Sequence, residues 1–263
     1  MRILLVNDDG IEAEGLRHLV NWAKTKGEVT VFAPTTQQSG KSQSIQIRGT
    51  FSMQKVDPFD GIEAYSVDST PADCVRVAIL GMKKQFDLVI SGINNGPNLG
   101  ADIRYSGTAG AAFEAAGLGV KTMAISAIFN SFDNAVKNLD RVYEEIQRRR
   151  MFDHADLLNV NFPKEGEEIL VTKMGPAIYS DDFEFLEDGT VKPRLITLYD
   201  GTCDLTLDTD AVMTGHISIS PLGADLTDRT AYEMISKECS GRDAATKAEP
   251  RKRLVSFRRT QVK

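Results

Sequence analysis

Short apolar runs alternate with longer amphipathic segments through residue 162 of this chain. The runs have the length of buried strands, and polar or glycine-containing segments close them. The predicted strands cover 2–6, 28–33, 86–90, 120–126 and 157–162, and the predicted helices cover 12–25, 70–80, 109–117 and 133–149. This alternation predicts an α/β fold with a doubly wound, mostly parallel sheet.

Two regions depart from the alternation. Residues 45–67 contain the short pieces SIQI, FSMQKV and EAYSV, which predict a small β-meander inserted into the wound pattern. Residues 179–215 are acidic, rich in turn residues and weakly periodic, with one strand predicted near 195–199. Residues 216–222 alternate cleanly and predict a returning strand. No internal repeat is visible, so we expect a single domain over residues 1–240.

The composition fits a protein with a sizeable core and no membrane anchor. Of the 263 residues, 41% are hydrophobic, and no run approaches the ~18 apolar residues that a membrane-spanning helix needs. The first apolar run ends before Asp8, which is too early for a signal peptide. The three cysteines are widely spaced and fit neither a disulfide framework nor a zinc site. We therefore expect a cytoplasmic protein that does not bind membranes.

The charge is unevenly distributed. The whole chain carries −6, but residues 242–263 hold eight basic and two acidic residues, so this tail carries +6 and the rest −12. The basic tail, residues 241–263, could contact nucleic acid or an acidic subunit surface, or remain a solvated end. The acidic body argues against specific nucleic-acid binding.

Asp8 and Asp9 follow the first predicted strand directly. Adjacent carboxylates repel each other unless a positive charge lies beside them, and oxygen ligands favour Mg²⁺, Mn²⁺ or Ca²⁺. A single aspartate here would also serve as a cap on the following helix, with Gly10 making the turn. The pair alone leaves both interpretations open.

Two further polar loops follow buried strands, at 35–44 with Ser39 and at 91–100 with Asn94, Asn95 and Asn98. Ligands of open α/β sheets bind at the carboxyl ends of the strands, so we expect these loops to converge with Asp8. Serine, asparagine and glycine are also ordinary turn residues.

Ser106, Gly107 and Thr108 precede the alanine-rich helix. Free N–H groups and hydroxyls at a helix N-terminus bind anions, although a plain N-cap explains the same residues.

Motifs of other enzyme classes are absent or misplaced. Asp208 and Asp210 match the D-x-D-x-V pattern of one phosphatase class, but they lie late, in the irregular region. The chain lacks G-x-G-x-x-G, G-x-x-x-x-G-K-[ST] and G-x-S-x-G, and its three histidines are isolated. Dinucleotide, P-loop, serine-hydrolase and zinc chemistry therefore lack support.

Three motifs resemble the signature of the SurE (stationary-phase survival protein) family in order and spacing. They are MRILLVNDDG at the N-terminus, SGINNGPNLG at 91–100 and YSGT at 105–108. Ser39, within QQSGKS, is similar to the Ser-Gly loop of the family, and STPADCV, LLNVNFP and TDAVMTGHISISPL resemble further segments. The resemblance covers roughly residues 1–235. Gln37 and Gln38 depart from a stretch that is often basic in the family.

The resemblance implies a Rossmann-like core with a projecting C-terminal β-hairpin extension at about 176–215, used in homodimer or homotetramer assembly. It implies hydrolysis of 5′- and 3′-nucleoside monophosphates, and in some members of polyphosphate. It also implies one divalent metal ion, Mg²⁺ or Mn²⁺. Carried over to this chain, the metal ligands are Asp8, Asp9, Ser39 and Asn94.

The residues and the resemblance together predict a mechanism. Asp8 and Asp9 are the catalytic candidates, and Asp8 is preferred as the group that orients or deprotonates the attacking water. The predicted phosphate-binding residues are Asn98, Ser106, Gly107 and Thr108.

Two other functions are considered. A phospho-signalling receiver module also places an acidic pair after its first strand, but it needs an aspartate where this chain has Ser91. A catalytically silent, nucleotide-binding regulatory protein would keep the metal site without turnover.

Overall fold

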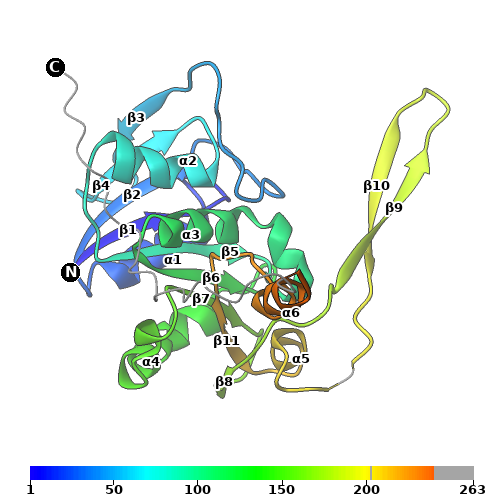
Figure 1. Ribbon diagram of the computed structural model, residues 1–263. Coiled ribbons are helices and arrows are strands. Elements are labelled where there is room, and N and C mark those ends of the chain that lie inside the picture. The colour runs from blue at the N-terminus through cyan, green and yellow to red at the C-terminus, as the bar shows by residue number, and fades with distance from the viewer. Residues whose placement is uncertain (202, 240–263) are drawn as a thin grey trace. The chain divides into compact units, whose positions relative to one another are not determined.

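A nine-stranded sheet lies at the centre of the computed structural model, which describes residues 1–201 and 203–239. The strand order is β3-β4-β2-β1-β5-β6-β7-β11-β8 (Figure 1). Six of the eight neighbouring pairs are parallel, and β3–β4 and β7–β11 are antiparallel. The strands are β1 (Arg2–Val6), β2 (Glu28–Pro34), β3 (Met53–Val56), β4 (Glu63–Val67), β5 (Leu88–Asn95), β6 (Lys121–Ala127), β7 (Leu157–Phe162), β8 (Ile169–Val171) and β11 (Ile217–Leu222). The predicted fold class is confirmed.

Helices cover both faces of this sheet, as the doubly wound prediction requires. α1 and α4 pack on one face, and α2 and α3 pack on the other. The helices are α1 (Glu14–Ala23), α2 (Pro71–Arg76), which continues into the π-helix η1 (Val77–Gly81), α3 (Gly107–Gly117), α4 (Asp133–Arg148), α5 (Asp208–Met213) and α6 (Arg229–Cys239), with 3₁₀ helices η2 (Gly100–Tyr105) and η3 (Met151–Asp153).

β1 shows why the central strands are continuously apolar. Ile3 and Leu5 belong to the core beneath α1 and α4, whereas Leu4 and Val6 belong to the core beneath α2 and α3. All four side chains are fully buried. Because successive side chains of a strand point to opposite faces, a strand covered on both sides needs an apolar residue at every position.

The sheet edge at residues 45–67 differs from the predicted meander. β4 pairs in parallel with β2, and β3 pairs antiparallel with β4, so both strands extend the central sheet. The SIQI piece at 44–47 forms no strand. Alternation shows only that one face of a strand is covered, and this holds both for a separate meander and for edge strands of the main sheet. The sequence pieces therefore do not distinguish the two arrangements.

A two-stranded hairpin projects from the body (Figure 1). β9 (Tyr179–Phe185) pairs antiparallel with β10 (Val191–Thr197), and neither strand joins the central sheet. The sequence predicted one strand here, near 195–199, and missed β9. The reason is that β9, with the sequence YSDDFEF, is largely exposed and lacks the alternation that a half-buried strand shows.

The contacts divide the chain into Met1–Ala224 and Asp225–Lys263. The first unit holds the sheet and the hairpin, and the second holds α6. The basic tail at 241–263 lies outside the described residues, and the predicted domain end at 240 stays a prediction. Within the described part of the chain, no helix has the length and apolarity that crossing a membrane requires.

Asp208 ties the irregular region to the sheet edge. The side chain is fully buried at the start of α5. One carboxylate oxygen accepts from the N–H of Gly100 at 2.9 Å, and the other accepts from Gly175 at 2.7 Å and Thr209 at 2.8 Å. The first aspartate of the D-x-D-x-V match is therefore a structural clamp, which holds the main chain at Gly100, Gly175 and Thr209 together.

Replacing this carboxylate should destabilise the fold. Asp208→Ala removes the acceptor of three main-chain N–H groups, and we expect it to lower the free energy of unfolding by about 3 kcal/mol in urea denaturation. Asp188→Ala is the control, since Asp188 accepts two hydrogen bonds from Thr190 at an exposed turn. Its expected change is under about 1 kcal/mol, and equal losses in the two variants would contradict the clamp.

Candidate active site

The carboxyl ends of β1, β2 and β5 lie at one edge of the sheet, because these strands are adjacent and parallel. The chain runs from β1 outward through β2 and later returns to β5 on the other side of β1, so the strand order reverses at this edge. Asp8 and Asp9 follow β1, Ser39 lies after β2, and Asn94 belongs to the end of β5. Four residues that lie far apart in the sequence are therefore carried by neighbouring strand ends.

Asp8 is buried against the first turn of α3, with 4% of its surface exposed. The Thr108 hydroxyl donates to Oδ1 of Asp8, and the N–H of Gln38 donates to the Asp8 carbonyl oxygen at 2.7 Å. A Cβ at Gly107 would lie 2.8 Å from Cβ of Asp8 and 3.1 Å from the Gln38 carbonyl oxygen. Only glycine lets the helix approach the carboxylate this closely.

Gln37 joins two of the predicted metal ligands. Its Nε2 donates to Oγ of Ser39 at 3.0 Å and to Oδ1 of Asp9 at 3.4 Å. The N–H of Asn95 donates to the other carboxylate oxygen of Asp9 at 3.1 Å. The loops after β1, β2 and β5 are thus linked through Asp9 by neutral amide donors.

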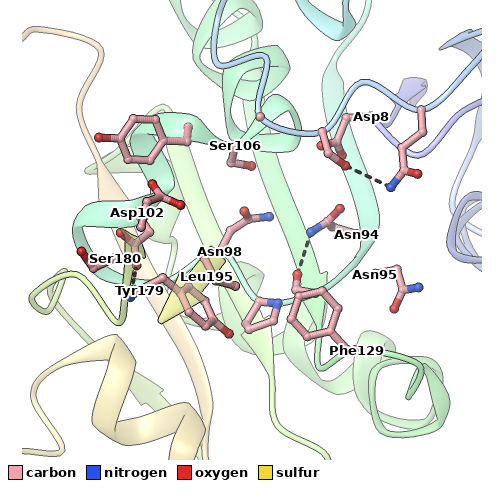
Figure 2. A pocket seen from close by; sticks show the side chains of 17 residues that line it. Asp8, Asn94, Asn95, Asn98, Asp102, Ser106, Phe129, Tyr179, Ser180 and Leu195 are labelled. Carbon is pink, nitrogen blue, oxygen red and sulfur yellow. Dashed lines mark hydrogen bonds between the residues drawn. The ribbon is translucent and has the colours of Figure 1, made fainter. Parts of the chain in front are cut away.

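Asn94 has its side-chain amide oriented by the main chain. Nδ2 donates to the carbonyl oxygen of Gly96 at 2.7 Å, which leaves Oδ1 as the acceptor end of the amide. Asn94 lines the same pocket as Asp8 and Ser39 (Figure 2). An amide oxygen held in this way suits a hard cation.

Burial disfavours the charged form of both carboxyl groups. Burial raises the pKa of Asp8 from 3.8 to about 6; the Thr108 hydroxyl opposes this rise, and the charge of Asp9 adds to it. Burial also raises the pKa of Asp9, against hydrogen bonds from Asn95 and Gln37. Within residues 1–201 and 203–239, neither aspartate forms an ion pair.

The donor set fits a hard divalent cation. In the described part of the chain, no group of three or more His, Cys, Asp or Glu side chains has metal-binding geometry. Any further ligands beside the aspartates would thus be neutral oxygens, such as those of Ser39 and Asn94. Mg²⁺ and Mn²⁺ bind carboxylate, hydroxyl and amide oxygens, and a cation there would offset the charges of buried Asp8 and half-buried Asp9.

Asn98 is held by a group of buried polar side chains. Oδ1 of Asn161 accepts from the N–H of Asn98 at 2.8 Å, and the amide nitrogens of Asn161 and Asn159 donate to its carbonyl oxygen at 3.0 and 2.9 Å. Its own Nδ2 donates to Oγ of Ser126 at 2.8 Å, which leaves a second N–H on that nitrogen. Asn98 lines the pocket in a fixed position.

The other predicted phosphate residues lie at the start of α3. Ser106 is the N-cap, its Oγ accepts from the N–H of Ala109 at 3.0 Å, and it lines the pocket. Gly107 and Thr108 face Asp8 and are not among the described residues that line this pocket. Their predicted contact with phosphate stays a prediction; the geometry gives Thr108 the position of a residue that holds the Asp8 carboxylate.

The pocket has a volume of about 430 Å³ and continues to the base of the hairpin. Residues of its wall to which the sequence assigned no role are Gln37, Asp102, Tyr105, Phe129, Tyr179, Ser180, Asp181 and Leu195, although Gln37 was noted as a departure and Tyr105 lies in the YSGT motif. Most of them come from segments without a motif, and the hairpin residues reach the pocket only through tertiary packing. Asn159 and Asn161 carried a usable signal, because two asparagines inside the apolar run LLNVNF are unusual for a buried strand.

The buried charge of Asp8 predicts an unusual stability profile in chelator-treated protein. The pKa of Asp8 is about 6 in the folded chain and 3.8 for an ordinary aspartate, so its charge costs about 3 kcal/mol of folding free energy above pH 6. That cost disappears as the pH falls toward 4. Asp8→Asn should therefore be more stable than the wild type at pH 7.5, with a difference that shrinks between pH 6 and 4 in urea denaturation. A difference that does not depend on pH would contradict the assignment.

Comparison with known proteins identifies the family of this chain. Residues 3–181 match the family described as survival protein SurE. The 5′-nucleotidase SurE of Clostridium botulinum (strain Kyoto / Type A2) is 39% identical over 254 residues, covering 89% of this chain and 97% of the relative. That of Desulfitobacterium hafniense (strain DSM 10664 / DCB-2) is 38% identical over 244 residues, covering 87% and 93%. The crystal structure of the SurE protein from Aquifex aeolicus superposes with a TM-score of 0.77 at 32% identity, over 90% of this chain and 99% of that one. This chain belongs to the SurE family.

Proposed function

We propose that this protein is a metal-dependent 5′-nucleotidase that hydrolyses nucleoside monophosphates to nucleoside and phosphate. The observation that carries the proposal is the adjacent pair of buried Asp8 and half-buried Asp9, which has no ion-pair partner in the described chain, with Asp8 held by Thr108 at the start of α3. Relatives that are 36–39% identical over most of this chain are named 5′-nucleotidases, which supports the same reaction.

One divalent ion, Mg²⁺ or Mn²⁺, is the proposed cofactor, with Asp8, Asp9, Ser39 and Asn94 as its ligands. When bound, such an ion would stabilise the negative charge of the phosphate oxygens and lower the pKa of a coordinated water. The hydrogen bond from Gln37 holds Ser39 beside Asp9, and the bond to Gly96 keeps the oxygen of Asn94 available.

Asp8 is the proposed general base. Thr108 holds one carboxylate oxygen, so the other is the one that can accept a proton from the attacking water. The same hydrogen bond fixes the orientation of the carboxylate, so its free oxygen has a defined direction toward the pocket that Asp8 lines.

Asn98 and Ser106 are the proposed groups that bind the phosphoryl oxygens. Asn98 retains an amide N–H beyond its bond to Ser126, and Ser106 lies at the positive end of α3. Because Asn159 and Asn161 fix the main chain of Asn98, its donor requires little reorganisation as negative charge develops.

We include homo-oligomer formation through the hairpin in the proposal. Phe183, Phe185 and Leu198 are 52%, 80% and 52% exposed on or next to β9 and β10. Exposed apolar side chains gathered on one projecting element favour burial against another copy of the chain.

Phosphate release tests the proposed reaction. Chelated protein should release no phosphate from nucleoside monophosphates, and Mn²⁺ or Mg²⁺ should restore release. Asp9→Asn should lower kcat/KM by about 10²- to 10³-fold, whereas Glu12→Gln, an equal charge change at an exposed neighbour, should have little effect. Nucleotide binding by folded, metal-loaded protein without phosphate release would instead favour the silent regulatory protein.

A further inference from the structure

A short segment of the loop after β2 is attached at both of its ends. We define the arch as residues 38–42, with the sequence QSGKS, which holds one of the proposed metal ligands. At its first end, the N–H of Gln38 donates to the carbonyl oxygen of Asp8 at 2.7 Å. At its second end, the N–H of Ser42 donates to the carbonyl oxygen of Tyr105 at 3.1 Å. The arch therefore connects the end of β1 with the end of η2, the segment that leads into α3.

Two glycines of α3 make room for the two ends of the arch. Gly107 and Gly110 are three residues apart, and residues with this spacing share one face of a helix. A Cβ at Gly107 would lie 3.1 Å from the carbonyl oxygen of Gln38, and a Cβ at Gly110 would lie 2.1 Å from that of Ser42. The arch thus lies along the first turns of α3, at a separation that a side chain at Gly110 would not allow.

Ser42 adds a side-chain contact to the second end. Its hydroxyl donates to the carbonyl oxygen of Arg104 at 2.8 Å, so one residue binds two successive carbonyl groups of η2. Ser42 has a φ of 52°, in the left-handed region that is unfavourable for a residue with a Cβ. The contacts with η2 and α3 therefore hold Ser42 in a conformation that the isolated chain disfavours.

The residues that follow the arch are attached as well. Nε2 of Gln43 donates to Oε2 of Glu114 in α3 at 2.9 Å. The hydroxyl of Thr70, the N-cap of α2, donates to the carbonyl oxygen of Ser44 at 2.7 Å. The second end of the arch is thus continuous with a segment that is bound to both helices on this face of the sheet.

The two attached ends restrict Ser39. Only residues 39–41 lie between them, and so short a span has few conformations. Ser39 and Gly40 line the pocket at the end where Figure 2 shows Asp8. Gln37 orients the hydroxyl of Ser39 through a hydrogen bond, whereas the arch determines where the main chain of Ser39 lies.

We propose, on the basis of the metal-dependent nucleotidase function above, that Ser42 and Gly110 are positioning residues, which hold Ser39 at the metal site through the arch. Neither is among the described residues that line the pocket, so both act through Ser39. A ligand that is held in place before the ion binds loses little freedom on binding. Ser42 and Gly110 therefore raise the affinity for a divalent ion without coordinating it.

The first test displaces the second end of the arch. In full-length protein, Gly110→Ala should raise the Kd for Mn²⁺ by about tenfold or more, since its Cβ would push the carbonyl group of Ser42 away. The electron paramagnetic resonance signal of free Mn²⁺ measures this Kd without any turnover.

Gly117→Ala is the matched control. It makes the same change in the same helix, and in the described chain its Cβ would meet nothing within 4 Å outside the adjoining helix backbone. Alanine favours the helix at both positions, so a difference between the variants reports the arch. Gly117→Ala should change the Kd by less than about twofold, and equal Kd values for the two variants would overturn the proposal.

The second test removes one hydroxyl and decides the question if Gly110→Ala does not fold. Ser42→Ala keeps the main-chain bond to Tyr105 and should raise the Kd for Mn²⁺ by about 3- to 10-fold, the value of one hydrogen bond. Ser44→Ala is the control, because Ser44 is exposed and its hydroxyl has no hydrogen-bond partner in the described chain. A Kd that Ser42→Ala leaves unchanged would overturn the role of Ser42.

Removing Ser39 separates positioning from a general structural role. If Gly110 acts through Ser39, adding Gly110→Ala to Ser39→Ala should change the Kd for Mn²⁺ by less than about twofold. A further loss as large as the one in the wild-type background would show that the arch supports the whole site and would overturn the positioning of Ser39.

Mn²⁺ binding and phosphate release together distinguish the two proposals. Phosphate release by the wild type, with unchanged Mn²⁺ affinity in Gly110→Ala and Ser42→Ala, would overturn the positioning role and leave the nucleotidase function. Mn²⁺ binding without phosphate release from nucleoside monophosphates would overturn the nucleotidase function, while the Kd values would still decide the positioning role. A folded wild type that binds no Mn²⁺ and releases no phosphate would overturn both.

Discussion

The structure depends on keeping the Asp8 carboxylate buried at the end of β1. Removing a carboxylate from water is costly, and here the cost is offset in part by the Thr108 hydroxyl and by the position of the carboxylate at the start of α3. That contact requires a glycine at 107, because a side chain there would collide with Asp8 and with the loop after β2. One buried charge thus fixes how β1, α3 and the 35–44 loop approach each other.

The remaining cost would favour a cation beside Asp8. A carboxylate whose charge the protein disfavours gains more from a divalent ion than an exposed one does, because the ion removes a penalty already present. Asn98 is prepared differently, by Asn159 and Asn161, which occupy positions that an apolar sheet would give to valine or leucine. Hydrophobic burial is lost at these two positions, and in return their side chains hydrogen-bond to the main chain of Asn98 and fix the loop after β5.

How much the sequence could predict follows from where each residue lies on the chain. Asp8, Ser39 and Asn94 lie within five residues after the apolar runs that end at Val6, Pro34 and Ile90, and parallel strands bring such positions together whatever the details of packing. Gln37 was noted only as a departure, because its link between Asp9 and Ser39 depends on a side-chain rotamer. Tyr179 and Asp181 were not found, because β9 is exposed and meets the pocket through Asp102, far away in the sequence.

The residues that line the pocket are held by two different elements, the central sheet and the β9–β10 hairpin. The proposed metal and phosphate ligands come from strand ends and one helix start of the central sheet, whereas Tyr179, Asp181 and Leu195 line the pocket from a hairpin that joins no strand of that sheet. Asp102 connects the two, since it binds the hairpin base and lies in η2, which leads directly into Ser106. The position of the hairpin residues in the pocket therefore depends on Asp102 and η2, whereas Asp8 and Asp9 are positioned by β1.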